Sequence, residues 1–548
     1  MEKRLPVTQR KKSPRIVISP RAASVQLYRM LALLGSHTPT PRMMSPWSGA
    51  LPKGSEPGSF AHAYLESEVL SKFDDGKLSP ERTSETWKRF YSAEEQCRLS
   101  NEFLKSERSS TRFFGLGDGQ QLLWSAAQKI RTILGDFSWD EAERYFGWGP
   151  GASTRLSRRR SHAAYKYSGR PDSTIGNAAL ALACIKRSPI WEDGLEFREG
   201  SGYCNIVPGN RIVTVPKNYK TDRTIAIEPC MNMYVQKGIG GVIRRRLKRA
   251  GLDLNDQTRN QRLARVGSIA GSLATIDMSM ASDTISQEIV RQLLPADWFE
   301  ALGQCRSPVG VLPSGELITY QKFSSMGNGY TFELETLIFY GLCLAVCDLL
   351  RVKDHRISVY GDDIIVPTEM VPKLLELLTY SGFTPNTKKT HVTGPFRESC
   401  GKHYFSGYDV SPFYVKRPVS TLSDLFLLHN QIYRWCKQVA QWDDTAPLSE
   451  LREVVLSLRK QAPVQWRKPR IPDGVGDGAF IGTFDECTPQ RAPFGLEGYQ
   501  VGLLTAVSRS SEVDTKGRLL SALRSIRGPI ATDVNLQFED HREGGISL

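Results

Sequence analysis

The sequence lacks the features of a membrane-spanning, disulfide-bonded or zinc-binding protein. Its longest apolar run lies around residues 337–347, which is too short for a membrane span and is closely flanked by Glu335 and Asp348. The ten cysteines include no Cys-x-x-Cys pair, and no His-x-x-x-His pair lies near them. Such scattered cysteines favour a reducing cytoplasm over a disulfide scaffold.

Signals for export and for a dinucleotide-binding loop are also missing. The amino-terminal stretch MEKRLPVTQRKKSPR is basic, but no long apolar segment follows it, so we expect no signal peptide. The glycine-rich stretches GLGDGQ and GWGPGAS follow no convincing strand, which argues against a dinucleotide-binding loop. Cys343 and Cys347 lie on one face of an apolar helical pattern, where core packing is favoured over metal binding.

What the chain does have is an excess of basic residues. Its 548 residues include 72 Lys and Arg against 58 Asp and Glu, which gives a formal charge of +14. This length allows several subdomains around a large core. The charge suits a polyanionic partner such as nucleic acid, although a solvated basic surface is the alternative, because charge bears on association and not on fold.

Strand and helix patterns are densest between residues 205 and 410. NRIVTVPKN (210–218) alternates like a strand, and GSLATIDMS (271–279) predicts a short buried strand that ends at Asp277. SDTISQEIVRQLL (282–294) predicts a helix capped by Ser282 or Asp283. Further helices are predicted at 330–346 after a glycine-rich loop, at 371–383, near 420–440 and at 448–460. Residues 1–60, rich in Pro, Ser and basic residues, predict a loosely packed lead-in.

One short stretch, SVYGDDIIVP (358–367), places two adjacent aspartates inside an apolar, β-branched run. The pattern predicts a hairpin, that is, two strands joined at a Gly-Asp turn. Asp362 and Asp363 would raise each other's pKa, and burying either one without a partner is costly. A structural explanation is that Gly361 and Asp362 form the turn and Asp363 caps it. The explanation we favour is a bound divalent cation.

Asp277 strengthens the case for a cation. An aspartate at the end of a strand, followed by a tight turn, can face the tip of a neighbouring hairpin. Three carboxylates at such a place form an oxygen-rich site that suits Mg²⁺, which keeps several waters and takes one or two carboxylates plus substrate phosphates. This arrangement is typical of a two-metal phosphoryl-transfer centre.

Positive charge for a triphosphate is supplied by the stretch VPKNYKTDR (215–223). Lys217, Lys220 and Arg223 are spaced three apart after the alternating strand, and they could hold the β- and γ-phosphates and stabilise departing pyrophosphate. An exposed basic loop is the alternative. The run IRRRLKR (243–249) predicts a helix with basic faces that suits template phosphates better than chemistry.

Five stretches together resemble a known family. IDMSMASDTIS, SSMGNGYTFELETLIF, SVYGDDIIVP, NTKKT and FRESCGKHYFSG occur in the order of motifs A to E of viral RNA-dependent RNA polymerases. The sequences of these motifs resemble the replicase catalytic subunit of small single-stranded RNA bacteriophages, the leviviruses. The resemblance is strongest from about residue 200 to 418. The resemblance implies an α+β right-hand polymerase fold of fingers, palm and thumb with an antiparallel palm sheet. It implies a lead-in at 1–60, a fingers-rich region with motif F at 61–262, a palm with motifs A to D at 263–395, and motif E, thumb and C-terminal region at 396–548.

The resemblance also assigns residues. Asp277 takes the metal-ligand position of motif A, Asp362 and Asp363 take those of motif C, and Lys217, Lys220 and Arg223 fall in motif F, which lines the nucleotide entry path. Asn328 of motif B is a candidate for contacting the ribose or the new base pair, or else is a turn residue. Many of these polymerases carry a second motif A aspartate that senses the ribose 2′-hydroxyl. Asp283 lies near that position, but five residues rather than four separate it from Asp277, which leaves helix capping as an alternative. In motif D, Lys388 or Lys389 could protonate the leaving pyrophosphate, and Lys389 is the catalytic candidate.

The function implied by the resemblance is an RNA-directed RNA polymerase. Such an enzyme replicates a viral single-stranded RNA genome by nucleotidyl transfer with two Mg²⁺ ions, for which Mn²⁺ substitutes, and initiates without a primer. Template RNA, nucleoside triphosphates, host elongation factors Tu and Ts and ribosomal protein S1 are the implied partners, with no membrane, in the cytoplasm of a bacterial host. One alternative is a reverse transcriptase, but Gly361 and the motif B sequence argue against it. The other is an inactive polymerase-like RNA-binding scaffold, but the intact aspartates argue against it.

Overall fold

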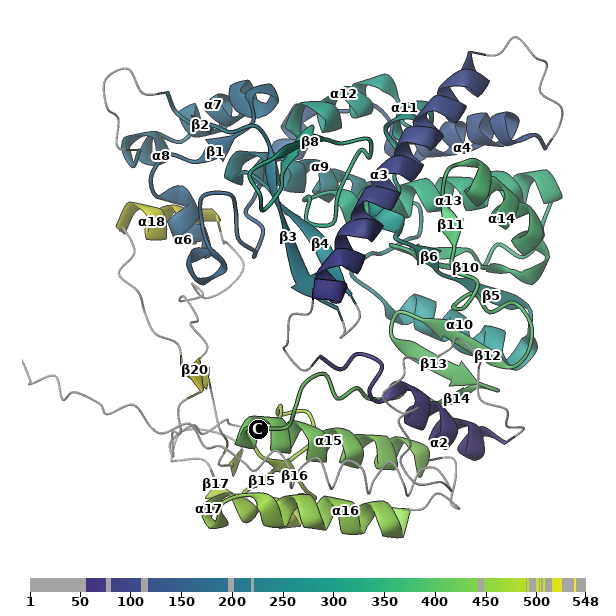
Figure 1. Cartoon of the computed structure of the whole chain (residues 1–548), viewed down its shortest axis with the longest axis vertical. Coiled ribbons are helices and arrows are strands. Elements are labelled where there is room, and N and C mark those ends of the chain that lie inside the picture. Colours follow the sequence, from purple (N-terminus) through teal and green to yellow (C-terminus); the bar gives the residue numbers. More distant parts are fainter. Residues whose placement is uncertain are drawn as a thin grey trace, which may run out of the picture. The chain divides into compact units, whose positions relative to one another are not determined.

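The computed structural model (Figure 1) describes residues 56–74, 80–109, 117–195, 202–217, 221–441 and 448–488, with shorter segments at 490–491, 499–501, 503, 506–507, 515–524 and 537–538. The chain divides into two compact units. The smaller unit comprises residues 1–76, 412–511 and 531–548, and the larger comprises 77–411 and 512–530. All but the last five residues of the predicted lead-in lie outside the described residues.

The predicted strands around the aspartates form one antiparallel sheet in the larger unit. Strands β5 (Leu273–Ile276), β9 (Ser358–Tyr360) and β10 (Asp363–Pro367) pair in the order β5-β10-β9, so the predicted hairpin is confirmed. Every residue of β5 is buried, as are the last four of β10, which explains their β-branched and apolar composition. A two-stranded pair of β6 (Met278–Ser279) and β11 (Thr384–Pro385) follows directly after Asp277.

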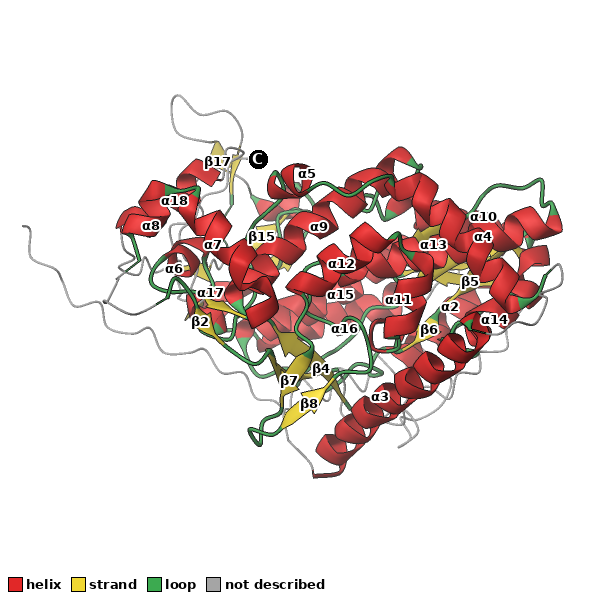
Figure 2. Ribbon diagram, turned by 90° about the horizontal axis from the view of Figure 1, so that it is seen from above, coloured by secondary structure: helices red, strands yellow, loops and turns green. Residues whose placement is uncertain are grey.

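Helices of the larger unit bury their apolar faces in one core. The long helix α13 (Thr331–Leu350) lies beside α4 (Gly119–Leu134), as both Figure 1 and Figure 2 show. The approach is close at Gly341, where a Cβ would stand 2.6 Å from Ile130 Cγ1. Cys343 and Cys347 are buried on α13, in agreement with the predicted packing role. The same core includes α9 (Cys230–Arg249), α11 (Gln287–Leu293), α12 (Ala296–Cys305) and α14 (Val371–Tyr380).

A second sheet carries the basic stretch. Strands β3 (Asn210–Pro216) and β4 (Asp222–Ile227) form an antiparallel hairpin that continues through β7 (Val309–Val311) to β8 (Leu317–Thr319). The long helix α3 (Pro80–Arg108) anchors this hairpin, because buried Arg82 donates from Nε to Asp222 Oδ1 at 2.6 Å. The loop that carries the basic residues therefore starts from a fixed base.

A third sheet packs against α10 (Thr258–Ala270) and consists of β12 (Phe396–Ser399), β13 (Lys402–Phe405) and β14 (Tyr408–Asp409). The guanidinium of Arg397 is completely buried and donates to the carbonyl oxygens of Leu273, Val392 and Gly394. This buried cation ties the third sheet to β5 by satisfying backbone acceptors that water cannot reach.

The remaining elements are short in the larger unit and mainly helical in the smaller one. The larger unit adds α5 (Trp139–Glu143), α6 (Ala163–Tyr167), α7 (Ala178–Lys186), α8 (Pro189–Asp193), α18 (Thr515–Arg524), β1 (Asp172–Ser173) and β2 (Asn205–Ile206). The smaller unit contains α2 (Pro57–Glu68), α15 (Leu422–Val439), α16 (Leu448–Gln461), α17 (Val464–Arg467), β15 (Arg470–Ile471), β16 (Phe480–Ile481), β17 (Gln490–Arg491), β18 (Tyr499–Gln500), β19 (Ala506–Val507) and β20 (Gln537–Phe538). Helices α15 and α16 confirm the two helices predicted beyond residue 411. Within the described part of the chain, no helix is both long enough and apolar enough to cross a bilayer.

One local prediction is wrong. The helix predicted from Ser282 begins at Gln287, and its N-cap is Ser286, whose side chain accepts from the Ile289 N–H. Residues 281–283 instead form a 3₁₀ turn, entered through Met280 with a positive φ of 55°, so neither Ser282 nor Asp283 caps the helix.

The basic run lies on the helix α9, as predicted, and three of its arginines are paired internally, whereas Arg249 is exposed. Arg244 binds Glu333 with an N–O distance of 2.7 Å, and Arg245 and Arg246 both bind Glu141. The acidic partners come from other helices, so the pairing is invisible in the local sequence.

Candidate active site

The register of the first sheet brings the predicted aspartates to one edge. Ile364 lies opposite Ile276, so Asp363 and Asp277, the next residues in antiparallel register, lie at the same end of the strands. Asp362 occupies the turn between β9 and β10. Directly opposed residues of an antiparallel pair project from the same face of the sheet.

The hairpin tip is fixed against α13. Gly361 has a positive φ of 63°, and a Cβ there would stand 2.7 Å from the Phe332 ring, so glycine is required at this place. Its N–H donates to Thr336 Oγ1 at 2.9 Å. The two aspartates that follow thus leave a turn that is held against α13.

Burial and mutual repulsion perturb the carboxylates. Burial, reinforced by the charge of Asp362, raises the pKa of Asp363 to about 7, although the Cys400 N–H donates to its Oδ2. Burial raises the pKa of Asp277 to about 6; the charge of Lys389 opposes this shift and that of Asp362 adds to it. Such raised pKa values are expected of carboxylates that are partly desolvated and lie near one another.

The donor set fits a hydrated divalent cation. Among the described residues, no three His, Cys, Asp or Glu side chains stand close enough together to enclose a metal ion by themselves. Asp277 Oδ2 accepts from Asn386 Nδ2 at 2.7 Å, and Asp363 Oδ2 accepts from the Cys400 N–H. A cation that keeps most of its waters and takes one or two carboxylates, as Mg²⁺ does, suits this arrangement better than Zn²⁺.

A further acid, Glu335 on α13, is buried near this edge, where Asp277 and Asp363 are partly buried and Asp362 is exposed. It was missed in the sequence. Its Oε2 accepts from Ser282 Oγ at 3.2 Å, while its buried Oε1 has no hydrogen-bond partner among the described residues. Burial, with the charge of Asp362, raises the pKa of Glu335 well above its ordinary value. The only sequence signal was a glutamate within an otherwise apolar helix.

Of the two motif D lysines, Lys389 is the one whose charge interacts with the aspartates. Burial lowers the pKa of Lys389, but the charges of Glu398, Asp277 and the aspartate pair outweigh it and raise the pKa overall. Its Nζ lies 3.7 Å from Glu398 Oε1. Lys388 lies on the same turn, and both lysines are exposed.

The motif F cations are only partly described. Lys217 follows β3 and Arg223 belongs to β4, whereas Lys220 lies outside the described residues. Burial and the charges of Arg223 and Lys389 lower the pKa of Lys217, and the charge of Asp277 opposes them. The structure thus brings Lys217, Arg223, Lys389 and Asp277 within electrostatic range of one another.

Asn328 is held by a buried carboxylate that the sequence did not predict. Its Nδ2 donates to Glu228 Oε1 at 2.7 Å, and its Oδ1 accepts from the Ser325 N–H. Glu228 also accepts from Asn210, Gln236 and Ser307. The Gly-Asn-Gly loop is therefore a turn with a fixed asparagine.

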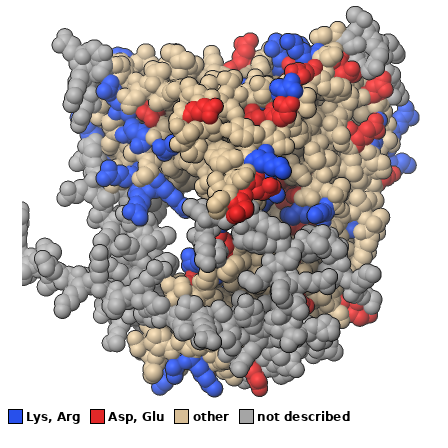
Figure 3. All heavy atoms as spheres, in the orientation of Figure 1, with Lys and Arg blue, Asp and Glu red and all other residues tan. Residues whose placement is uncertain are grey.

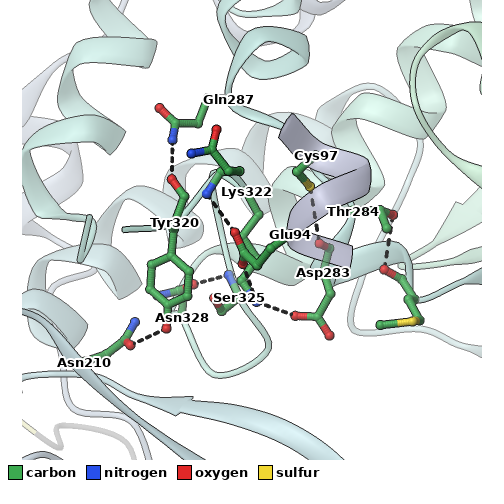
Figure 4. Close-up of polar contacts among 12 residues, drawn as sticks. Glu94, Cys97, Asn210, Asp283, Thr284, Gln287, Tyr320, Lys322, Ser325 and Asn328 are labelled. Atoms are coloured by element: carbon green, nitrogen blue, oxygen red, sulfur yellow. Dashed lines mark hydrogen bonds and ion pairs between the residues drawn. The ribbon is translucent and has the colours of Figure 1, made fainter. Parts of the chain in front are cut away.

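Asp283 takes part in a buried ion-pair cluster, which Figure 4 shows from the side of α3. Lys322 Nζ lies 2.8 Å from Asp283 Oδ1 and 3.4 Å from Glu94 Oε1. All three side chains are at least nine-tenths removed from solvent as residues, with exposures of 2%, 8% and 6% in that order.

A cavity of about 340 Å³ adjoins the Asn328 loop. Its walls are mostly apolar, with Trp148, Ile225 and Met233, and two lysines line it. Lys166 donates to the carbonyl oxygens of Gly149 and Gly151, and burial lowers the pKa of Lys166 to about 8. Lys237 donates to the Trp148 carbonyl at 3.2 Å.

Basic side chains also gather on the surface of the larger unit. Figure 3 shows Lys and Arg clustered toward the edge that α6 and α7 form in Figure 1. Shortly before α6 in the chain, Arg158, Arg159 and Arg160 form an exposed 3₁₀ turn. Lys186 and Arg187 at the end of α7 are exposed but form ion pairs with Glu192 and Glu143. The patch is suited to a polyanion.

A carboxylate-bearing sheet edge with cations beside it is typical of phosphoryl-transfer centres as a class. Residues 30–495 match the family described as RNA replicase, beta-chain. The chain is 45% identical over 433 residues to the RNA-directed RNA polymerase subunit beta of Escherichia virus Qbeta, covering 78% of this chain and 70% of the relative. It is 44% identical over 425 residues to the protein of the same name from Enterobacteria phage SP, covering 77% and 72%.

The chain belongs to the RNA replicase beta-chain family. It is an RNA-directed RNA polymerase of the single-stranded RNA phage type, which uses template RNA and nucleoside triphosphates and depends on divalent metal. The predicted family and activity are confirmed, and the reverse transcriptase alternative is set aside. A solved structure titled "RdRp complex" overlaps with a TM-score of 0.36 at 13% identity, over 63% of this chain and 33% of that chain.

Proposed function

We propose that nucleotidyl transfer takes place at Asp277, Asp362 and Asp363, with two Mg²⁺ ions for which Mn²⁺ can substitute. The observation that carries this proposal is the register that puts Asp277 and Asp363 at one end of the sheet, with raised pKa values. When bound, the metals lower the pKa of the RNA 3′-hydroxyl and neutralise the triphosphate. The aspartates fix where this chemistry occurs, and in-line attack at the α-phosphorus releases pyrophosphate.

The cations around the aspartates bind the phosphates and supply the proton for the leaving group. Lys217, Lys220 and Arg223 hold the β- and γ-phosphates, and Lys389 delivers a proton to the leaving pyrophosphate. Asp283 and Asn328 read the ribose and the new base pair. We further propose fingers at 61–262, a palm at 263–395 and a thumb at 396–548, with β5-β10-β9 as the palm sheet.

Template recognition is delegated to base pairing, so the protein grips the RNA backbone and 2′-hydroxyls rather than base edges. The exposed arginines 158–160 suit template phosphates. The apolar walls of the cavity beside Asn328 suit the flat face of a template base, and Lys237 suits its phosphate.

The biological setting follows from the family. We propose that the enzyme replicates a viral single-stranded RNA genome, initiates without a primer and works in the cytoplasm of a bacterial host. Elongation factors Tu and Ts and ribosomal protein S1 are the proposed partners. Purifying the tagged chain from host cells and identifying the co-purifying proteins tests these assignments.

A metal-binding test independent of activity uses the raised pKa values. Asp277 and Asp363 bind protons in the folded state up to about pH 6 and 7, whereas in the unfolded chain they release them near 3.8. Without divalent cations, the stability that protonation of these groups contributes is present below pH 4 and is lost as pH rises toward 7. Added Mg²⁺ should therefore raise the melting temperature strongly at pH 8 and little at pH 5, as measured by scanning fluorimetry in chelator and in Mg²⁺.

The same melts in Asp363→Asn provide the control. The substitution should remove most of the Mg²⁺-dependent rise at pH 8. An equal rise in the substituted and unsubstituted proteins would show that the cation binds elsewhere.

Lys389→Met should lower kcat by about 10²-fold, the usual contribution of a general acid, with little change in KM. The neighbouring Lys388→Met, which removes an exposed charge from the same turn, is the matched control and should retain most activity. Steady-state incorporation on a homopolymer template measures both. Equal losses in the two variants would contradict the assignment to Lys389.

A further inference from the structure

The turn between β12 and β13 has an unfavourable backbone conformation. Ser399 and Lys402 are the last paired residues of the two strands, so Cys400 and Gly401 form a two-residue turn. Both have a positive φ, 48° for Cys400 and 73° for Gly401. Such a turn favours Asn-Gly or Gly-Gly, because other side chains rarely adopt this left-handed conformation. A cysteine at the first position therefore needs contacts from outside the Cys400–Gly401 turn to hold it.

Those contacts come from the first turn of α10. Gln261 Nε2 donates to the Cys400 carbonyl at 3.1 Å, and Asn260 Nδ2 donates to Ser399 Oγ at 3.3 Å. Two adjacent residues of one helix thus bind two adjacent residues of the hairpin. The Cys400–Gly401 turn is therefore held from α10.

Asn260 also binds both strands of the hairpin that carries the aspartates. The residue is 3% exposed; its Oδ1 accepts from the Ser358 hydroxyl of β9 at 2.6 Å. Its Nδ2 donates to the Asp363 carbonyl of β10 at 3.2 Å. The amide is fixed in one orientation, since its oxygen and its nitrogen face different partners. Asn260 thereby sets the Cys400–Gly401 turn against the β9–β10 hairpin.

One carboxylate of the candidate active site depends on this arrangement. The Cys400 N–H donates to Asp363 Oδ2 at 3.1 Å. The Cys400 thiol is protonated beside the same carboxylate, because burial and the charge of Asp363 raise its pKa. A hydrogen bond to a carboxylate that binds metal fixes the orientation of that carboxylate. The position of the Cys400–Gly401 turn therefore determines how Asp363 is oriented.

We propose that Asn260 and Gln261 are positioning residues, which hold the Cys400–Gly401 turn so that its N–H fixes Asp363 Oδ2 and leaves Oδ1 to take a divalent cation. The inference rests on the proposed metal-binding role of Asp363. Neither residue is itself a ligand, and both act through the backbone of Cys400. A carboxylate that offers one oxygen suits Mg²⁺, which demands near-ideal octahedral geometry, better than Ca²⁺, which also takes both oxygens of a carboxylate. The positioning residues should therefore favour Mg²⁺ over Ca²⁺.

Cation binding in the absence of RNA and nucleotide tests the proposal without reference to activity. The EPR signal of free Mn²⁺ gives the dissociation constant of Mn²⁺, and displacement by Mg²⁺ or Ca²⁺ gives theirs. The double variant Asn260→Leu/Gln261→Met removes the hydrogen bonds with side chains of similar size and adds no charge. Its Mg²⁺ dissociation constant should rise about 10- to 100-fold, the usual effect of losing a residue that orients a ligand. The Ca²⁺ dissociation constant should rise less, and an equal rise for both cations would overturn the proposal.

Gln257→Met is the matched control on the same helix. It removes an exposed hydrogen bond from α10 to the Tyr360 hydroxyl but leaves the Cys400–Gly401 turn untouched. This variant should bind Mg²⁺ and Ca²⁺ as the unsubstituted enzyme does. If it loses Mg²⁺ binding as strongly as the double variant, the effect does not run through the turn and the proposal is refuted.

Asp363→Asn separates the inference from its premise. If this substitution leaves the Mg²⁺ dissociation constant unchanged, Asp363 binds no metal and the proposed site assignment is wrong. If it weakens Mg²⁺ binding while the double variant binds Mg²⁺ normally, only the role of Asn260 and Gln261 is refuted.

A rescue experiment keeps the buried Asn260 in place, so that the fold is not at stake. Gln261→Met alone, at a partly exposed position, should cause part of the loss of Mg²⁺ binding. Adding Cys400→Gly should restore binding, because glycine adopts the left-handed conformation without support and still carries the N–H. A loss that Cys400→Gly does not reverse would show that Gln261 acts other than through the turn, and would refute the proposal.

Discussion

Asp362→Asn should lower nucleotide incorporation by about 10³-fold or more while leaving the affinity for template RNA within about twofold. The amide removes a negative charge from the turn between β9 and β10, where the carboxylate is proposed to hold metal. Several kcal/mol of transition-state stabilisation depend on such a metal, and each 1.36 kcal/mol is worth tenfold in rate. Template binding rests on distant basic residues and should not change.

The measurement is single-turnover extension on a defined template, with filter binding of the same RNA in parallel. Asp348→Asn is the matched control, since that aspartate forms an exposed ion pair with Lys129 and such pairs contribute about 0–1 kcal/mol to stability. The control should keep at least half of the activity. Synthesis by Asp362→Asn at more than a tenth of the rate of the unsubstituted enzyme would refute its assignment as a metal ligand.

The parts of the fold that local patterns encode were predictable. The alternation and β-branching around Asp362 predicted the β9–β10 hairpin, because a strand pattern flanking a Gly-Asp pair leaves few other conformations. The apolar periodicity of α13 and α14 predicted those helices for the same reason. The start of α11 was missed, because Ser282, Asp283 and Ser286 are all good N-caps and only the turn at Met280 decides between them.

The polar contacts that hold the site together were not predictable from local patterns. Lys322 and Asp283 are 39 residues apart, and Asn328 and Glu228 are 100 apart. From the sequence, a lysine or glutamate between strands is predicted to lie on the surface, since charged side chains are rarely buried without a partner. Only the tertiary fold supplies the partner, so the pairing of Arg244, Arg245 and Arg246 on α9 could not be predicted, for the same reason as that of Lys322.

Glu228→Leu should lower the free energy of unfolding of the larger unit by about 3–5 kcal/mol, because it leaves several buried donors unpaired. Asn210 and Asn328 donate to Oε1 at 2.7 Å each, and Gln236 and Ser307 donate to Oε2 at 3.0 and 2.9 Å. Loss of this carboxylate also frees Asn328, so incorporation should fall beyond what stability explains.

The milder Glu228→Gln should still cost about 1–3 kcal/mol, although it is nearly isosteric. The new amide NH₂ must face donors on one side or the other, and the facing amides cannot simply turn over. Asn210 Oδ1 accepts from the Tyr320 hydroxyl, and Gln236 Oε1 accepts from the Gly329 N–H at 2.8 Å. Urea unfolding followed by tryptophan fluorescence measures the loss, with exposed Glu316→Gln as the matched control. If Glu228→Gln unfolds at the same urea concentration as that control, the four donors are satisfied by other means and the carboxylate does not organise the Asn328 loop.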